Sequence, residues 1–199
     1  MLPRVFVVLV LFALQGQLFA DVLFQDNFNT QNGGVPALVV TTLSGWSVTG
    51  NVDLVGNGFH DYYPGNGLYV DMEGSESNAR IQTTASFAPG FYLLTFFLGN
   101  NWEVWRPGCT TCGLDNTLTV TLGDFTRTYA ATNAGQYVNV SFAATVAGPL
   151  TFEGGGPVDS TGGILDNVVL NAIPEPGSMA LTGAALLGFV ALLRRRRPN

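Results

Sequence analysis

The chain has 199 residues, room for one domain of ordinary size, and its 47% hydrophobic content is that of a folded protein rather than a disordered one. All eight basic residues are arginines, and only three of them lie in residues 21–173, together with thirteen of the acidic residues, so that this stretch carries a net charge of −10. Because phosphate backbones would be repelled by such a domain, the charge argues against a nucleic acid partner.

Residues 1–20 have the organisation of a secretory signal peptide. Arg4 supplies the positive charge, residues 5–14 form a short apolar run, and Ala20 is a residue that signal peptidase accepts before the cut. Ten apolar residues are too few to span a bilayer. The alternative to a signal peptide is that this run forms a buried helix of the fold. We expect the Sec machinery to export the chain and residues 1–20 to be removed.

Residues 21–171 are predicted to form short strands. In TLTVTLG and YVNVSFAA, apolar and polar side chains alternate, which is typical of a half-buried strand, and FYLLTFFLG is apolar enough for a central one. Further strands are expected at residues 37–41, 46–49, 52–55, 68–72, 79–84, 125–129, 150–152 and 164–170. No stretch has a helical stripe, and Trp46 is expected in the core. The pattern predicts an all-β fold, an antiparallel jelly-roll-like β-sandwich.

Aromatic residues concentrate in two loops between these strands. GNGFHDYYPGNG carries Tyr62 and Tyr63, and GNNWEVWRPG carries Trp102 and Trp105. Such rings can stack on the C–H faces of sugars, which makes these four residues candidate ligand contacts. The alternative is core filling, because sandwiches bury large rings.

Three acidic residues, Asp71, Glu73 and Glu76, follow one strand closely in VDMEGSE. Glycoside hydrolysis needs two carboxyl groups across a cleft at a defined separation, one of them with a raised pKa. Acids strung along a strand end do not meet this requirement. We therefore expect them on the surface or in a turn, and no catalytic residue is assigned.

Cys109 and Cys112 form a CxxC pair in RPGCTTCGLDN. In a cytosolic chain this spacing would suggest a redox motif or half of a zinc site, but there is no second pair and His60 is the only histidine. Export to an oxidising compartment favours a small loop-closing disulfide.

Three motifs together resemble the choice-of-anchor C type of exported domain, which is related to galactose-binding-like jelly rolls and to some carbohydrate-binding modules. They are GWSVTGNVDLVGNGFHDYYPGNGLYVDMEGS, FYLLTFFLGN and GGILDNVVL. The resemblance implies a β-sandwich with a glycan or matrix ligand. In related jelly rolls calcium often ties the first strand to the last, and the matching positions here are Asn29 and Asp166, with Asp26 able to compensate for the missing acid at Asn29. The alternative is that Asp166 only hydrogen-bonds a turn or a neighbouring strand.

The chain ends with IPEPGSMALTGAALLGFVALLRRRRPN. Residues 177–193 carry no charge and as a helix would reach about 25 Å, near the lower limit for crossing a bilayer. The arginines that follow are expected to hold that end in the cytoplasm. They are Arg194, Arg195, Arg196 and Arg197.

This ending, residues 172–199, resembles the PEP-CTERM sorting signal, with its triplet at Pro174, Glu175 and Pro176. The resemblance implies recognition by an exosortase, a membrane protease or transpeptidase that processes the chain near the triplet. We therefore expect an inner-membrane anchor before processing and a cell-surface or extracellular location afterwards. The leading function is glycan or exopolysaccharide binding by a non-enzymatic protein. The alternatives are a structural biofilm or envelope component without a ligand, and a carbohydrate-active enzyme.

Overall fold

The computed structural model describes residues 21–75, 77–102, 113–174, 183 and 187–189. The chain divides into two compact units. One consists of Val22–Ala172, and the other combines Met1–Asp21 with Ile173–Asn199. Among the described residues no helix is long and apolar enough to cross a membrane. The signal peptide and nearly all of the helix expected at 177–193 lie outside the described residues.

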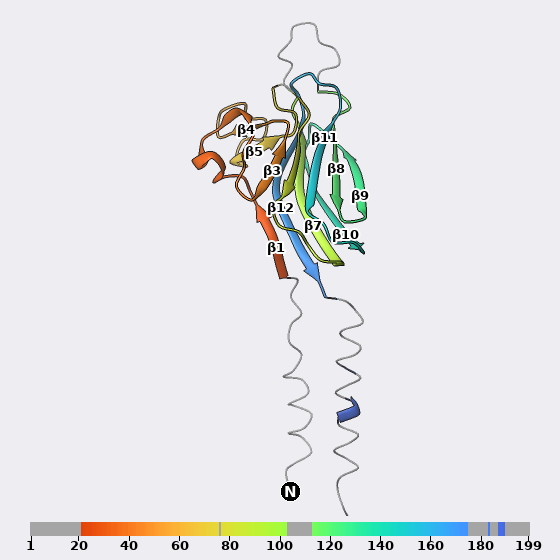
Figure 1. Ribbon diagram of the computed structural model, residues 1–199. Coiled ribbons are helices and arrows are strands. Elements are labelled where there is room, and N and C mark those ends of the chain that lie inside the picture. Colours follow the sequence, from red (N-terminus) through yellow and green to blue (C-terminus); the bar gives the residue numbers. More distant parts are fainter. Residues whose placement is uncertain (1–20, 76, 103–112, 175–182, 184–186, 190–199) are drawn as a thin grey trace, which may run out of the picture. The chain divides into compact units, whose positions relative to one another are not determined.

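The unit Val22–Ala172 is an antiparallel sandwich of two sheets (Figure 1). The seven-stranded sheet has the order β10 (Gln136–Ala144), β7 (Gly90–Asn100), β12 (Gly163–Ile173), β5 (Leu68–Asp71), β4 (Val52–Gly56) and β2 (Ala37–Val40), with β1 (Asp21–Asp26) also paired to β12. The five-stranded sheet has the order β3 (Trp46–Thr49), β6 (Arg80–Thr83), β11 (Leu150–Gly155), β8 (Thr117–Leu122) and β9 (Phe125–Ala130). A single 3-10 turn, η1 (Gln31–Gly34), links β1 to β2.

The predicted β-sandwich is confirmed. Each expected strand is present, and the run FYLLTFFLG lies in β7, between β10 and β12. Only β1 was missed. Its sequence, DVLFQD, leaves Val22 and Leu23 exposed, so it lacks the alternation of a half-buried strand.

The core fills the space between the sheets with alternate side chains from both. Phe152 of the smaller sheet and Phe96 of the larger one are fully buried, and their rings meet edge to face with centroids 5.4 Å apart. Trp46 is 5% exposed and stacks on Phe28 at 5.9 Å, which confirms its expected place in the core. This packing fixes the frame on which the loops are held.

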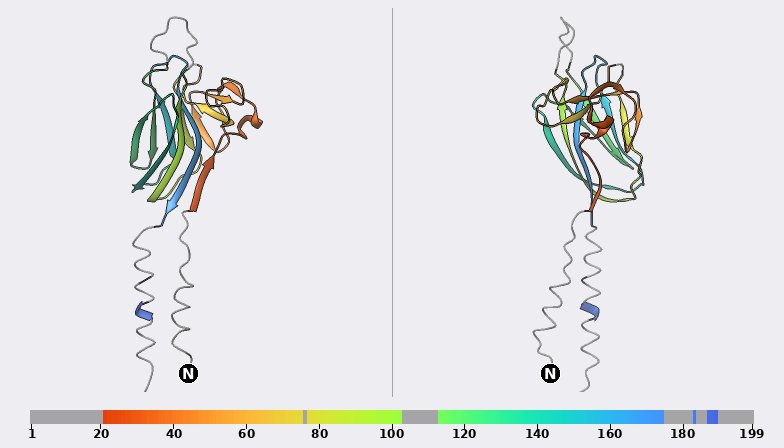
Figure 2. Two further views of the ribbon diagram at one scale, coloured as in Figure 1. Left: turned by 180° about the vertical axis from the view of Figure 1, so that it is seen from behind. Right: turned by 90° about the vertical axis from the view of Figure 1, so that its left-hand side faces the viewer.

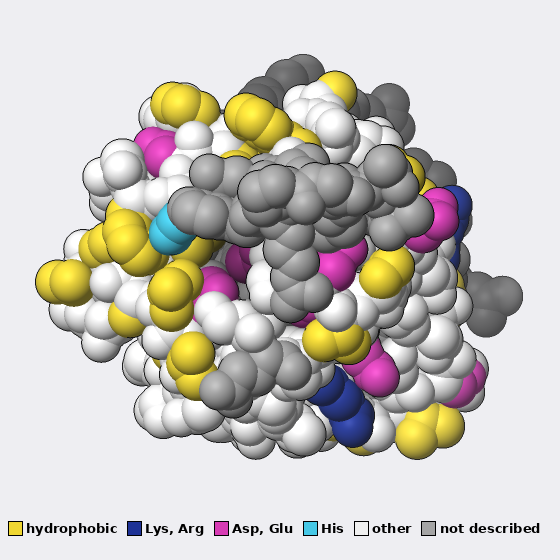
Figure 3. All heavy atoms as spheres, turned by 90° about the horizontal axis from the view of Figure 1, so that it is seen from above, with side chains coloured by type: hydrophobic (Ala, Val, Ile, Leu, Met, Phe, Trp, Pro, Cys, Tyr) yellow, Lys and Arg dark blue, Asp and Glu magenta, His cyan; other side chains and the backbone are white. Residues whose placement is uncertain are grey.

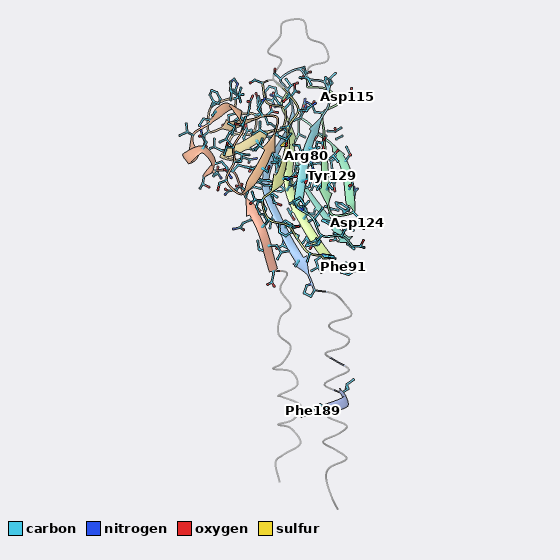
Figure 4. All side chains as sticks on the ribbon, in the orientation of Figure 1. Arg80, Phe91, Asp115, Asp124, Tyr129 and Phe189 are labelled. Atoms are coloured by element: carbon cyan, nitrogen blue, oxygen red, sulfur yellow. The ribbon has the colours of Figure 1, made fainter. Side chains whose placement is uncertain are left out.

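The sandwich has two distinct ends. The start of β1 and the end of β12 lie side by side at one end in both views (Figures 1 and 2). Phe91, at the start of β7, lies toward this end, whereas Asp115 lies at the opposite one (Figure 4). We call the end that carries Asp115 the loop end, because the connections after β7 and before β12 meet there.

Candidate functional site

The loop between β4 and β5 packs onto the outer face of the seven-stranded sheet. Its Tyr62 and Tyr63 join Tyr69 and Phe97 in an apolar cluster separate from the main core. The Tyr63 hydroxyl accepts a hydrogen bond from the backbone amide of Asn100 at 2.7 Å. Tyr63 therefore fastens the loop to the sheet, as the core-filling alternative expects for a ring.

Beyond this cluster, the same face of the sheet carries two carboxylates. Asp53 of β4 is paired directly with Asp71 of β5, two positions from the pair formed by Val55 and Tyr69. Residues directly opposite each other in antiparallel strands have β-carbons about 5 Å apart. Asp53 is 8% exposed and Asp71 is 2% exposed. Two like charges thus meet where water is largely excluded, which is costly unless a proton or a cation offsets it.

Both carboxylates line a cavity of about 290 Å³. Apolar groups form one part of its wall, and carboxylate, hydroxyl and amide groups form another. Its lining residues are Leu38, Asp53, Val55, His60, Tyr62, Asp71, Ser75, Asn101 and Ser160. Seen from the loop end, acidic side chains lie near the histidine and are bordered by hydrophobic ones (Figure 3).

Each of the four oxygens in the carboxylate pair accepts a hydrogen bond from the protein. The Oδ1 of Asp53 accepts from the Val39 amide at 2.7 Å, and its Oδ2 accepts from the Ser75 hydroxyl at 3.0 Å. The Oδ2 of Asp71 accepts from the Asn101 side chain at 2.7 Å, and its Oδ1 accepts from a backbone amide at 3.0 Å. Because a carboxylate oxygen has two lone pairs, each oxygen keeps one acceptor position for a ligand.

A further carboxyl group lies next to this pair. Glu73 is 1% exposed, and its Oε1 accepts a hydrogen bond from the Ser160 amide at 2.6 Å. Its Oε2, together with an oxygen of Asp159 and one of Asn51, is buried without a hydrogen-bond partner in the described part of the chain. Such unpaired acceptors are rare in native proteins, and three of the four unpartnered buried side-chain atoms among the described residues are these.

The acids after β5 therefore correct one expectation. Asp71 and Glu73 were expected on the surface or in a turn, and this is wrong, because side chains from later parts of the chain cover them. Glu76 lies outside the described residues.

Burial dominates the electrostatics of this region. It raises the pKa of Asp71 well above its ordinary value, and the nearby charges of Asp53 and Glu73 raise it further. Burial also raises the pKa of Glu73, and the charge of Asp159 adds to that rise. The two arginines among the described residues lie on β6 and β9 of the other sheet. Neither neutralises these acids.

Trp102 lies beside the cavity wall. It is 51% exposed, and its ring meets that of Tyr62 edge to face with centroids 6.2 Å apart. Next to it in the chain, Asn100 donates from its side chain to the Gly113 carbonyl at 2.6 Å and accepts from the Asn116 side chain at 2.9 Å. Of the four predicted ring contacts, the structure thus brings Tyr62 and Trp102 together at the cavity.

A second cavity, of about 330 Å³, lies between β1 and β12 and includes Asp26 and Asn167. Both oxygens of Asp26 are occupied. Oδ1 accepts from the Phe28 amide, and Oδ2 accepts from the side chains of Gln31 and Trp46, each at 2.7 Å. This carboxylate therefore ties the first strand to the turn and to the core tryptophan.

Asp166 lies near Asp26 but differs from it in its partners. It is fully buried, and its oxygens accept only from Asn167, at 2.6 Å from the backbone and 2.9 Å from the side chain. Burial raises the pKa of Asp166 to about 7, and the charge of Asp26 contributes to the rise. The Asn29 side chain instead accepts from the Leu68 amide at 2.7 Å.

The structure thus places Asp26 near Asp166, whereas the Asn29 side chain binds the Leu68 amide instead. Calcium takes six to eight oxygen ligands, and in the described ranges no three His, Cys, Asp or Glu side chains are arranged to hold a metal. A calcium ion between Asp26 and Asp166 would need backbone carbonyls and water to complete its shell. The site stays a prediction.

The remaining predicted residues fall outside the described residues, apart from Pro174, which directly follows β12. The disulfide and the membrane stop therefore stay predictions. The residues concerned are Trp105, Cys109, Cys112, Glu175, Pro176, Arg194, Arg195, Arg196 and Arg197.

Among the cavity residues that sequence reasoning missed are Asp53, Asn101 and Ser160. Asp53 left a signal, because a carboxylate inside the apolar strand VDLV must have a reason to be there. The other two left none, since they lie in connections whose courses are set by tertiary contacts.

A protein-family model described as the PEP-CTERM protein-sorting motif matches residues 172–197. No curated protein sequence is significantly similar to the chain.

Several solved structures resemble the sandwich. A Lys-gingipain adhesin domain from Porphyromonas gingivalis W83 matches 77% of this chain and 99% of its own, with 14% identity and a TM-score of 0.47. The xylan-binding domain CBM22-2 of Paenibacillus barcinonensis Xyn10C matches 75% and 99%, with 11% identity and a TM-score of 0.40. A family 35 carbohydrate binding module from Clostridium thermocellum matches 64% and 93%, with 17% identity and a TM-score of 0.40. These are similarities of fold, and no ligand is inferred from them. The chain carries a PEP-CTERM protein-sorting motif, which implies export and sorting to the surface by an exosortase.

Proposed function

We propose that this surface-sorted protein holds one sugar unit of an extracellular or cell-surface polysaccharide in the loop-end cavity. The observation that carries the proposal is the composition of the cavity, in which the Tyr62 ring and the aliphatic Leu38 and Val55 share the wall with Asp53 and Asp71.

A sugar presents two kinds of surface, and the cavity offers a counterpart to each. Its C–H faces are apolar and suit aromatic rings, here Tyr62 within the wall and Trp102 beside it. Its hydroxyl groups donate hydrogen bonds, and the oxygens of Asp53 and Asp71 keep acceptor positions for them. A volume of about 290 Å³ lies at the small end of ligand pockets, which fits one ring rather than a long chain.

Glycoside hydrolysis is the second candidate, because Asp53 and Asp71 are neighbours in the same cavity. Retaining glycosidases place two carboxyl groups about 5 to 5.5 Å apart, one with a raised pKa. However, Asp53 and Asp71 lie side by side on one face of a sheet rather than on opposite sides of a cleft, where they could flank a glycosidic bond. This supports binding over catalysis.

The experiment is retention on immobilised polysaccharides of the full chain in detergent micelles. Trp102→Ala should weaken binding about tenfold, because aromatic contacts contribute about 1 kcal/mol or more beyond burial. It should leave the free energy of unfolding unchanged, since the ring is 51% exposed.

The matched control is Phe91→Ala, which removes an aromatic ring that is 42% exposed at the other end of the sandwich (Figure 4). It should bind as the unchanged protein does. Equal losses in both variants would contradict the proposal. Retention of no polysaccharide would favour the structural component, and release of reducing sugar would favour the enzyme.

A further inference from the structure

The acidic cluster formed by Asp53, Asp71, Glu73 and Asp159 has more negative charge than the described protein offsets. The two strand aspartates and Glu73 are at least nine-tenths buried. Their hydrogen-bond donors are neutral amides and one hydroxyl, and the described arginines lie on the other sheet. Glu73 and Asp159 each retain a buried oxygen without a partner in this part of the molecule. Among the described residues, then, no positive charge offsets this cluster.

Three species can supply such a charge, namely a proton, a metal ion or the ammonium group of a ligand. A proton would neutralise one carboxylate but would leave the cavity without a ligand. A metal ion needs converging oxygens, and no three acidic, histidine or cysteine side chains among residues 21–75, 77–102 and 113–174 are so arranged. The walls formed by Leu38, Val55 and Tyr62 also suit carbon atoms rather than a hydrated ion.

We propose that the cavity selects a sugar with a free, protonated amino group, that is, a hexosamine unit that is not acetylated. The inference rests on the proposed glycan binding and names its substrate class. The ammonium group donates to the vacant acceptor positions of Asp53 and Asp71, while the ring carbons lie against Tyr62. Acetylation removes the charge and places a carbonyl oxygen beside two carboxylates, so the cavity disfavours the N-acetyl form.

Binding of such a group is expected to release a proton. Burial raises the pKa of Asp71, which favours a proton on this carboxyl in the free protein, and an arriving ammonium group would displace such a proton. The other titratable groups that face this position are Asp53, Glu73, Asp159 and His60. Affinity for the amino sugar should therefore rise with pH until the amine itself loses its charge.

The test compares trisaccharides of glucosamine, N-acetylglucosamine and glucose by calorimetric titration of the full chain in detergent micelles. The glucosamine form should bind at least about tenfold more tightly than the other two, because a hydrogen-bonded charge pair exceeds a neutral contact by that factor. Asp53→Asn and, separately, Asp71→Asn should remove most of this preference, because each should weaken binding of the glucosamine form far more than binding of the glucose form. Glu153→Gln, at an exposed position on β11 of the other sheet, is the matched control and should change nothing.

The outcomes separate this inference from the function on which it rests. If the glucose and N-acetyl forms bind as well as the amino form, the inference is overturned and glycan binding stands. If no trisaccharide and no immobilised polysaccharide binds, both fall. A third outcome is that calcium raises the thermal midpoint of unfolding, that Asp71→Asn loses this rise, and that the amino form binds no more tightly than the other two. In that case the cluster holds a metal ion and the inference is overturned.

Discussion

Two pairs of neighbouring aspartates in one sandwich differ in their relation to the rest of the protein. Asp26, near Asp166, receives three hydrogen bonds from the turn and the core, and Asp166 receives its own from the next residue. Asp53 and Asp71 line the loop-end cavity, and each of their oxygens accepts one hydrogen bond from the protein. The comparison teaches that residue type and burial do not separate a structural carboxylate from a ligand-binding one. The wall of the adjoining cavity does, because a tyrosine ring and two aliphatic side chains share it with Asp53 and Asp71, whereas the residues that line the cavity at Asp26 include no aromatic ring.

The comparison is tested most severely by the matched variants Asp26→Asn and Asp53→Asn. All three donors to Asp26 are N–H groups that cannot become acceptors, so the new amide leaves at least one of them unpaired, and we expect a loss of about 4 kcal/mol in the free energy of unfolding. In Asp53→Asn the Ser75 hydroxyl can turn to accept, and repulsion from Asp71 is relieved, so the change should stay within about 1 kcal/mol.

Urea denaturation of both variants measures the difference. Equal costs would mean that the two pairs have the same structural role, which would remove the basis of the comparison.

The pH dependence of stability is the next test of the contrast between the two aspartate pairs. The pKa of Asp166 is raised from its ordinary value of 3.8 to about 7. Between these values the native state holds a proton that the unfolded chain has lost, so stability falls as pH rises and levels off above about 7. Asp166 should contribute about 4 kcal/mol to this fall, and Asp166→Asn should remove that contribution.

Asp71 and Glu73, whose pKa values are also raised, contribute with the same sign, so part of the slope remains in that variant. The control is Asp124→Asn, because hydrogen bonds from Thr145 lower the pKa of this exposed group and its contribution has the opposite sign. An unchanged slope in Asp166→Asn would contradict the environment described for this residue.

Calcium gives the smallest expected effect. If the ion binds between Asp26 and Asp166, it should stabilise the protein by about 2.7 kcal/mol at a free concentration one hundred times its Kd, and chelation should reverse this. Asp166→Ala should abolish the gain. Asn29→Asp separates two roles of this residue. If position 29 binds calcium, the added charge should raise the calcium affinity. If its side chain only holds the Leu68 amide, the calcium affinity should not change. Calorimetric thermal unfolding with and without calcium is the measurement, and no shift would end the calcium prediction.

The sandwich itself was predictable because strand alternation is a local property. β8 and β10 alternate over their whole length, and Trp46 was placed correctly in the core. The cavity was not predictable, because Asp53 and Asp71 belong to different strands and become neighbours only through their register. Side chains of residues much later in the sequence cover Asp71, and no local sequence pattern predicts this contact.

The aromatic loops show the same limit within a few residues. Tyr62 and Tyr63 are adjacent and chemically identical, yet one lines the cavity while the other holds the loop onto β7. Sequence reasoning left packing and ligand contact open for both. Tertiary contacts such as the hydrogen bond from the Asn100 amide to the Tyr63 hydroxyl distinguish them.

The position of β12 has a mechanical consequence. This strand lies between β7 and β5, runs to Ile173, and leads directly into the sorting motif. A pull between a captured polymer at the loop end and an attachment beyond Ile173 would act along the strand axis. Its ladder bonds would then resist together in shear instead of opening one after another, as they do when a strand is peeled from its edge.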